Sequence, residues 1–238
     1  MKSVSDLKIK LFADGAEKTG MLEMYHNPLI KGFTTNPTLM RKAGITDYVS
    51  FAKDILSEIP DRPVSFEVFS DDFTEMKRQA LLINSWGKNV YVKIPVTNTE
   101  AKPSYPLIHD LIMMGVKLNV TAIMTLEQVR QVSLALGDYV PSIISVFAGR
   151  IADTGVDPVL IMKAAVELIQ DNKNQELLWA SPRELLNIIQ ADEVGCHIIT
   201  ATNDILKKLS LVGKELSDFS LDTVKMFRKD AINAGYEL

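Results

Sequence analysis

The sequence is poor in cysteine and has no strong excess of either charge, and both features exclude classes of protein. Cys196 is the single cysteine among 238 residues, so an internal disulfide and a cysteine-based zinc site are both excluded. It stands in the strand-like run VGCHIIT, which indicates an inert thiol in the core. The net charge of −4 is built from mixed signs, so we expect neither nucleic acid nor an acidic membrane surface as a partner.

Long apolar runs, metal-ligand spacings and glycine-rich loops are also lacking. No run approaches the roughly 18 residues of a membrane span, and MKSVSDLKIK at the N-terminus lacks the apolar stretch of a signal peptide. These absences predict a cytoplasmic protein. His26, His109 and His197 are scattered, and neither Gly149 nor Gly155 stands in a phosphate-loop pattern. The sequence therefore disfavours a zinc-dependent enzyme and shows no nucleotide-binding loop.

Short apolar runs alternate with amphipathic segments along the whole chain, of which 47% is hydrophobic. A helical pattern is clear in DDFTEMKRQALLINSW, where Phe73, Met76, Ala80 and Ile83 recur at helical spacing. Strands rich in Val and Ile that alternate with helices favour parallel pairing through right-handed crossovers. The eight candidate strands are residues 8–13, 30–34, 64–68, 90–94, 116–120, 141–146, 176–180 and 196–200.

Eight such units can close on themselves, so the pattern predicts an α/β protein with a (β/α)8 or TIM-barrel fold. No linker or low-complexity tract suggests a second domain, and we expect residues 1–238 to form a single barrel domain. An amphipathic segment at about 218–234 is left over and predicts an extra C-terminal helix.

Several helix starts are marked by capping residues. Thr125 with Gln128, and Ser181 with Glu184, resemble capping boxes, and Asp157 before a proline is a plausible N-cap. These positions predict where three of the crossover helices begin.

Polar residues follow the predicted strands, at the end of a barrel where chemistry is found. They are Asp14, Asn36, Glu67, Lys93, Asn119, Thr121, Ser145, Arg150, Ser181 and Arg183. Lys93 stands between Val92 and Ile94, and these apolar neighbours should desolvate it and favour a free amine able to attack a carbonyl. The alternative is an outward-facing strand lysine that reaches solvent, and composition alone does not separate the two.

Five segments resemble the transaldolase family, in the short-chain branch that includes fructose-6-phosphate aldolase. They are GFTTNPTLMRKAG (32–44), YVKIPVT (91–97), LNVTAIMT (118–125), SVFAGRIAD (145–153) and WASPRE (179–184), in order over nearly the whole chain. Thr-Thr-Asn-Pro and Val-Lys-Ile-Pro are the most specific parts. The resemblance implies a class I aldolase barrel that needs no metal or cofactor.

The resemblance also implies a role for each matched residue. Lys93 would form the Schiff base with the ketose carbonyl, and Asp14 would be the general acid/base. Glu67 and Thr121 would hold a catalytic water. Two asparagines would bind substrate hydroxyls and retain the dihydroxyacetone unit; they are Asn36 and Asn119.

Simpler structural roles stay open for these residues. Asn36 could be only a helix cap, and Asp14 could be a turn residue. Glu67 could pair with a basic side chain, while Asn119 and Thr121 could satisfy loop backbone. Their coincidence around Lys93 favours a shared site.

For the substrate phosphate, the resemblance implies Arg150 and Arg183 as anchors, with Ser145 and Ser181 nearby. The planar guanidinium fork suits phosphate oxygens, and a helix beginning at Ser181 would point free N–H groups at the same anion. Alternatively, Arg183 is a solvated residue at a capped helix start and Arg150 a structural ion-pair partner.

Phe147 departs from the aldolase subgroup, which typically carries tyrosine there, so SVFAGR is more similar to true transaldolases. We therefore expect a transaldolase-like transferase that moves a dihydroxyacetone unit between sugar phosphates. The alternatives are a fructose-6-phosphate-type aldolase and a barrel that only binds a sugar phosphate. The resemblance implies a homo-oligomer, either stacked pentamers or a dimer.

Overall fold

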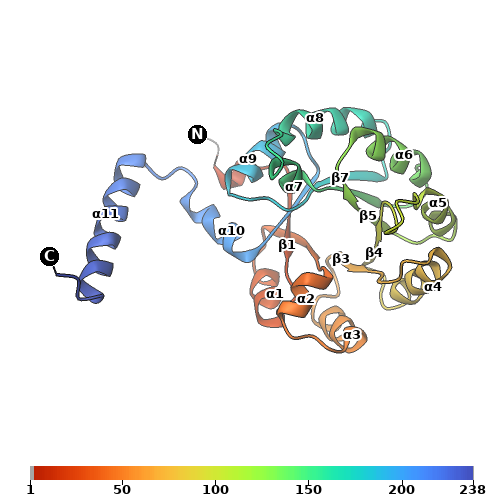
Figure 1. Ribbon diagram of the computed structural model, residues 1–238, viewed down its shortest axis with the longest axis horizontal. Helices are drawn as coiled ribbons and strands as arrows, with labels where there is room; N and C mark the ends of the chain where they lie inside the picture. The colour runs from red at the N-terminus through yellow and green to blue at the C-terminus, as the bar shows by residue number, and fades with distance from the viewer. Residues whose placement is uncertain (1–2, 238) are drawn as a thin grey trace.

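Eight parallel strands form a closed barrel in the computed structural model, which describes residues 3–237. Each strand pairs with its neighbours in sequence, and β8 closes onto β1. Figure 1 shows the helices surrounding the ring of strands. The strands are β1 (Lys10–Asp14), β2 (Ile30–Thr34), β3 (Val64–Glu67), β4 (Val90–Pro95), β5 (Leu118–Ile123), β6 (Ser142–Val146), β7 (Gln175–Trp179) and β8 (Ile198–Ala201).

The helices follow the strands in the expected alternation. Those of the α type are α1 (Lys18–Tyr25), α2 (Pro37–Lys42), α3 (Tyr48–Glu58), α4 (Phe73–Asn84), α5 (Tyr105–Met113), α6 (Leu126–Leu136), α7 (Ala148–Ala152), α8 (Pro158–Ile169), α9 (Leu186–Glu193), α10 (Asn203–Lys207) and α11 (Leu216–Asn233). Two short 3-10 helices are η1 (Val4–Asp6) and η2 (Lys208–Leu211). The predicted (β/α)8 barrel with an extra C-terminal helix is confirmed.

Local sequence explains several of these helices. Met76, Ala80 and Ile83 of α4 are buried, as their helical spacing predicts. Thr125 and Gln128 form the predicted capping box at α6, and Asp157 caps α8 by accepting from Val159 N–H. In each case a side-chain oxygen satisfies backbone donors that the first helical turn leaves free.

The predicted helix start at Ser181 is wrong. Helix α9 begins at Leu186, and Ser181 has a φ of 58°, which is left-handed backbone incompatible with a helical N-terminus. The predicted bounds of the strands are closer to those in the structure. The fifth strand was expected at 116–120 and runs over Leu118–Ile123. The eighth begins at Ile198, so Cys196 precedes it, buried, and burial raises the pKa of this thiol to about 12.

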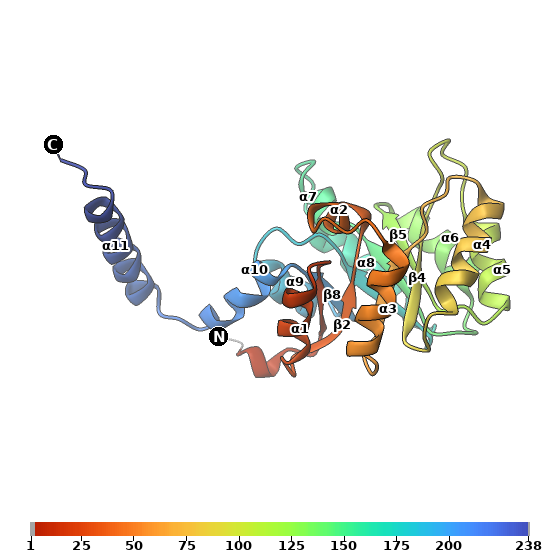
Figure 2. The ribbon, with the colours of Figure 1, turned by 90° about the horizontal axis from the view of Figure 1, so that it is seen from below.

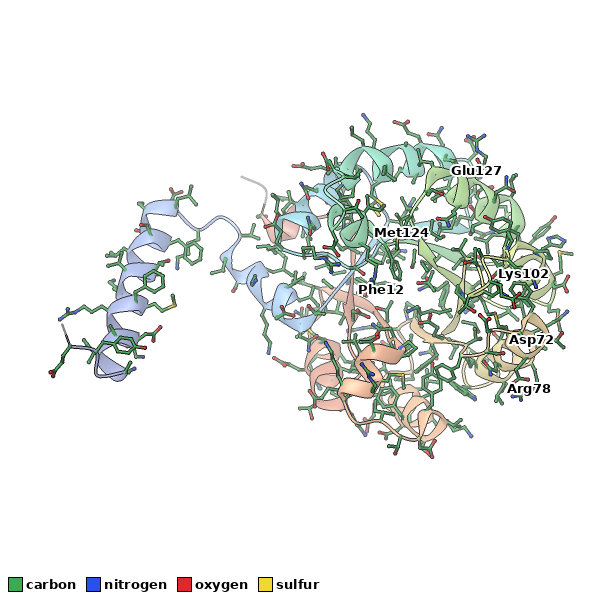
Figure 3. The ribbon with its side chains drawn as sticks, in the orientation of Figure 1. Phe12, Asp72, Arg78, Lys102, Met124 and Glu127 are labelled. Atoms are coloured by element: carbon green, nitrogen blue, oxygen red, sulfur yellow. The ribbon has the colours of Figure 1, made fainter. Side chains whose placement is uncertain are left out.

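The barrel interior has an apolar floor beneath a polar upper layer. Phe12, Ile143, Leu178, Ala180 and Ile198 pack together inside the ring, and Figure 3 labels Phe12 there. Because side chains on one face of a strand recur every second residue, the next inward positions after these floor residues lie one layer higher. Three of those positions are polar: Asp14, Ser145 and Thr200.

Gly32 of β2 makes room for this floor. A Cβ atom at Gly32 would lie 2.5 Å from the Phe12 ring, so only glycine admits the ring at that place. The larger apolar cluster lies between the strands and the surrounding helices, and includes fully buried Ile55, Ile94, Leu111 and Trp179. The strands are therefore packed on both faces, as parallel barrel strands require.

Helix α11 stands away from the barrel in both views (Figures 1 and 2). It was expected at about 218–234 and runs over Leu216–Asn233. None of its residues is buried, and large apolar side chains such as Phe219 and Phe227 are exposed. No helix among residues 3–237 combines the length and apolarity that crossing a membrane requires.

Candidate active site

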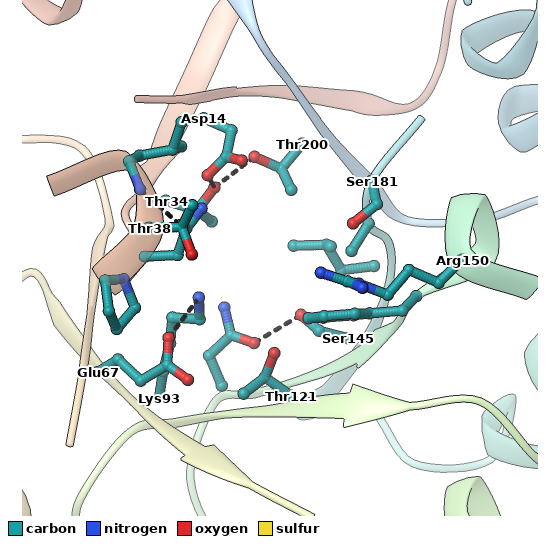
Figure 4. Close-up of a pocket in the computed structure, with 17 residues that line it drawn as sticks. Asp14, Thr34, Thr38, Glu67, Lys93, Thr121, Ser145, Arg150, Ser181 and Thr200 are labelled. Atoms are coloured by element: carbon teal, nitrogen blue, oxygen red, sulfur yellow. Dashed lines mark hydrogen bonds and ion pairs between the residues drawn. The ribbon is translucent and has the colours of Figure 1, made fainter. Parts of the chain in front are cut away.

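A cavity of about 370 Å³ opens at the carboxyl ends of the strands. Every site residue predicted from the sequence lines it except Arg183. Figure 4 shows Asp14 and Thr200 on one side of this cavity, facing Lys93, Glu67 and Thr121. Its lining is Asp14, Thr34, Asn36, Pro37, Thr38, Leu39, Glu67, Lys93, Asn119, Thr121, Ser145, Phe147, Arg150, Leu178, Ala180, Ser181 and Thr200.

Lys93 of β4 points into the cavity and is only 7% exposed. Its Nζ lies 3.2 Å from Glu67 Oε2 and donates to the Thr35 carbonyl at 2.8 Å. In the register of β3 and β4, Glu67 lies directly opposite Lys93. In the register of β4 and β5, Lys93 lies directly opposite Asn119. The lysine therefore does not reach outward to solvent, and its charge is met by a carboxylate and a carbonyl.

Asp14 lies at the end of β1 in a short chain of hydroxyl groups. Thr34 Oγ1 donates to Asp14 Oδ1 at 2.7 Å, and the Thr34 and Thr200 hydroxyl oxygens are 2.5 Å apart. Burial raises the pKa of Asp14, and this effect exceeds the opposing effects of Lys93 and of the Thr34 hydrogen bond. A carboxyl group with a raised pKa is suited to exchange a proton with a substrate nearer neutral pH.

Thr34 and Thr200 were not predicted as site residues. Both are the last residues of the strands predicted at 30–34 and 196–200. The strand-end criterion that found Asp14 would have found them too, but threonine is common in strands and its hydroxyl alone is a weak signal.

Asn119 of β5 is fully buried and is oriented by two serines. Its Nδ2 donates to Ser65 Oγ at 3.1 Å, and its Oδ1 accepts from Ser145 Oγ at 2.6 Å. The two serines lie on β3, beyond β4, and on the adjacent strand β6, so the amide is tied to both sides of the barrel wall. Ser145 thereby contributes to the site through Asn119 as well as by lining the cavity.

Thr121 is buried, and its Oγ1 has no hydrogen-bond partner within the described part of the chain. It lies within a register shift between β5 and β6, where the next residue, Ala122, takes a φ of 63°. Such a bulge inserts an extra residue and redirects the neighbouring side chain, at a cost of about 1–2 kcal/mol for a left-handed alanine. An unpaired buried hydroxyl facing a cavity is suited to hold a water molecule or a substrate group.

Asn36 has a structural role at the cavity rim. Its Oδ1 accepts from Leu39 N–H at 2.9 Å and caps α2, as the alternative reading of the sequence proposed. The residue also lines the cavity, and its amide nitrogen could donate to a ligand there.

Phe147 and Arg150 lie together on the side of the cavity formed by β6 and α7. Phe147 is the N-cap residue of α7, and the Arg150 guanidinium lies 5.8 Å from the centre of its ring. Arg150 is exposed, and its guanidinium points toward the cavity (Figure 4). An anionic group of a ligand would be attracted to this side.

Ser181 lies in the cavity wall, whereas Arg183 does not. Arg183 Nε donates to Asp153 Oδ1 at 2.8 Å, and its Nη2 donates to Asp153 Oδ2, so this edge of the guanidinium is engaged outside the lining. This ion pair raises the pKa of Arg183 and lowers that of Asp153. The guanidinium would have to leave Asp153 in order to bind a ligand in the cavity.

The cavity combines the buried primary amine of Lys93, the Asp14 carboxyl group with its raised pKa, and a cationic wall at Arg150. A primary amine can add to a carbonyl carbon, and the acid on the opposite side can exchange the proton of a neighbouring hydroxyl group. Residues 3–237 contain no cluster of three or more His, Cys, Asp or Glu side chains placed to hold a metal ion.

Comparisons with known proteins cover most of the chain. The family model described as transaldolase/fructose-6-phosphate aldolase matches residues 11–237. A "Probable transaldolase" from Thermoanaerobacter sp. is 32% identical over 97% of this chain and 100% of its own length. A "Probable transaldolase 2" from Listeria monocytogenes is also 32% identical, over 93% of this chain and 99% of its own.

A solved structure shares the fold at much lower identity. The crystal structure of a "putative phosphonomutase" from Burkholderia cenocepacia superposes with a TM-score of 0.55 at 10% identity, covering 93% of each chain. At that identity the likeness concerns the barrel alone.

Proposed function

The chain belongs to the transaldolase/fructose-6-phosphate aldolase family, and from this premise we propose that it is a transaldolase that works through a lysine Schiff base. Its substrates are a ketose phosphate donor and an aldose phosphate acceptor. The observation that carries the proposal is Lys93, whose buried amine faces the cavity 3.2 Å from Glu67 and on the opposite side from Asp14.

The reaction begins when the Lys93 amine adds to the ketose carbonyl. Loss of water from the carbinolamine yields an iminium ion, which can accept the electron pair of the carbon–carbon bond that breaks. Asp14 removes the proton of the hydroxyl group beside that bond, and the aldose leaves. The enamine that remains on Lys93 holds three carbons of the donor.

Transfer then runs the same steps in reverse with a second aldose phosphate. The enamine carbon attacks the acceptor aldehyde, Asp14 returns its proton to the new hydroxyl group, and water releases the ketose product. Glu67 and the unpaired hydroxyl of Thr121 would hold this water, and Asn36 and Asn119 would retain the bound three-carbon unit. No metal or organic cofactor has a step in this sequence.

Phe147 supports transfer over free aldol cleavage. A tyrosine hydroxyl at that position would add a proton donor beside the enamine and favour release of dihydroxyacetone. The phenyl ring of Phe147 has no such group and lies against Arg150 instead. Arg150 in turn favours a phosphorylated substrate over an unphosphorylated one, because a guanidinium at the rim can bind two phosphate oxygens at once.

The proposal is tested by trapping the iminium ion. Borohydride added with fructose 6-phosphate should fix a dihydroxyacetone-sized adduct on Lys93, located by peptide mapping. Lys93→Met should abolish trapping and leave the fold intact, because methionine fills a similar volume. Lys88→Met and Lys117→Met are matched controls on neighbouring lysines and should trap normally; an adduct on either lysine would overturn the assignment.

A second arm distinguishes transfer from cleavage. With erythrose 4-phosphate as a representative acceptor, the wild-type chain should form a new ketose phosphate much faster than it releases free dihydroxyacetone in the acceptor's absence. Equal rates would favour the aldolase, and ligand binding without trapping would favour a barrel that only binds sugar phosphates.

A further inference from the structure

The hydrogen-bond ladder between β2 and β3 stops one step before the site. Thr35 N–H donates to the Ser65 carbonyl at 3.2 Å. Parallel strands place such bonds at even spacing, so the next bond would run from Glu67 N–H to the Thr35 carbonyl. Instead Glu67 N–H donates to Tyr48 Oη at 2.8 Å, and the Thr35 carbonyl accepts from Lys93 Nζ at 2.8 Å.

Tyr48 occupies the missing place in the ladder from outside the barrel. It is the first residue of α3, and its hydroxyl also donates to the Glu67 carbonyl at 3.1 Å. Both backbone polar groups of Glu67 are therefore held by one phenol. Burial raises the pKa of Tyr48, so this hydroxyl group keeps its proton at any ordinary working pH.

The ring of Tyr48 is fixed by other aromatic side chains. It makes edge-to-face contacts with Phe66, Phe69 and Trp86, at centroid distances of 6.1, 4.5 and 5.7 Å. This packing holds the hydroxyl against the Glu67 backbone. Tyr48 itself does not line the cavity, so it is positioned to act on the site without touching a substrate.

We propose that Tyr48 is a positioning residue for the Lys93–Glu67 pair. Its hydroxyl takes the place of the Thr35 carbonyl in the ladder, which leaves that carbonyl free to hold the Lys93 amine. By the same contact it fixes the strand end from which the Glu67 carboxylate faces Lys93 at 3.2 Å. The inference rests on the proposed function, because the pair matters to the rate only if Lys93 is the reacting amine.

Removal of the hydroxyl would disturb the pair in one of two ways. Glu67 N–H would either stay unpaired or bond the Thr35 carbonyl, and the second choice would take the acceptor from Lys93. In either case the substrate-binding groups elsewhere in the cavity stay in place. We therefore expect slower chemistry with little change in substrate binding.

Tyr48→Phe tests this directly, because the ring contacts remain. We expect kcat for transfer and the rate of borohydride trapping to fall by about tenfold, with KM for fructose 6-phosphate within about twofold of wild type. Tyr25→Phe is the matched control: its hydroxyl donates to Asp61 at 2.7 Å at the C-terminal end of α1, neither residue lines the cavity, and its loss should leave kcat unchanged.

Two further variants separate positioning from stability. Trp86→Phe weakens the same aromatic cluster without removing the hydroxyl, so its Tm should fall while its kcat stays near wild type. In a Glu67→Gln background, Tyr48→Phe should lower the trapping rate by clearly less than the roughly tenfold drop expected in the wild-type background, because the part of its effect that acts through the Glu67 carboxylate is already lost.

The outcomes distinguish this inference from the proposed function. If the wild-type chain does not trap fructose 6-phosphate, the proposed function fails. If it traps but Tyr48→Phe keeps the wild-type kcat, or loses equal activity in the Glu67→Gln background, the positioning role fails. Loss of folding in Tyr48→Phe while Trp86→Phe stays folded would also overturn it, since the hydroxyl would then serve stability alone.

Discussion

Arg150 and Arg183 were predicted to be equivalent anchors, yet they have different partners. Arg150 lines the cavity beside Phe147, whereas Arg183 is bonded through two nitrogens to Asp153. The side chains of Arg183 and Asp153 are 47% and 52% exposed, so solvent screens their ion pair and a strong anion can compete for it. A role for Arg183 in phosphate binding stays a prediction and requires this exchange of partners.

The two arginines should therefore differ in their effect on phosphorylated donors. A charge-assisted contact is worth about 1.5 to 3 kcal/mol, so Arg150→Ala should raise KM for fructose 6-phosphate by roughly one to two orders of magnitude. Arg183→Ala should raise it by at most about tenfold, because its contact with phosphate replaces an existing ion pair. Steady-state kinetics with unphosphorylated fructose is the control, and equal losses on both donors would mean that the arginines serve structure only.

At the scale of elements, the start of α7 and the loop after β7 touch through a glycine. Gly149 N–H donates to the Ala180 carbonyl at 3.2 Å. A Cβ atom at Gly149 would lie 1.5 Å from the Ser181 carbonyl oxygen, which no rotamer can relieve. The contact sets the relative position of two cavity-lining residues, Ser181 and Arg150.

Gly149→Ala should therefore destabilise the protein although alanine favours a helix. Helix propensity would contribute about 1 kcal/mol in favour of alanine. Displacement of the Ser181 backbone should outweigh it, so we expect the free energy of unfolding to fall by about 1 to 3 kcal/mol. KM for phosphorylated donors should also rise, because Ser181 and Arg150 move apart.

Urea unfolding of Gly149→Ala and of a glycine control measures this balance. A Cβ atom at Gly15 would meet nothing within 4 Å, so Gly15→Ala should change the unfolding free energy by less than about 0.5 kcal/mol. An increase in stability for Gly149→Ala would show that the loop yields easily and that its position is not set by this contact.

At the scale of the whole molecule, α11 has an apolar face that stays exposed in the described part of the chain. Leu216, Phe219, Val224, Met226 and Phe227 recur at spacings of three, seven and eight residues and are 44–80% exposed. An 18-residue helix that buries none of these side chains needs another surface to cover them. We propose that the chain forms a homo-oligomer through α11.

Substitution on the apolar face should release monomers. Phe219→Ser combined with Phe227→Ser should lower the mass measured by light scattering to that of one 26.5 kDa chain. Lys225→Ser lies on the opposite face of the helix and should leave the mass of the assembly unchanged. A wild-type chain that is itself monomeric over micromolar concentrations would contradict the proposal.

Much of this architecture was determined by the sequence alone. The alternation of apolar and amphipathic segments predicted eight strands in a barrel, because side-chain periodicity is a local property of the chain. The same alternation predicted which polar residues follow each strand, and the barrel brings ten of the eleven predicted site residues to one cavity. The helix caps at Thr125 and Asp157 were also predicted from the sequence, since a cap acts within three residues.

Only the tertiary structure decided which partner each polar group takes. Ser181 resembles a helix cap in sequence but is turned into left-handed backbone against Gly149, and Arg183 is drawn to Asp153, thirty residues away. In the sequence, nothing distinguishes Tyr48 from an ordinary helix residue. Only the structure shows that its hydroxyl takes the place of a strand carbonyl. These contacts join segments that are distant in sequence, so no local pattern records them, and the packing of α3 and α7 against the barrel determines the distances that chemistry requires.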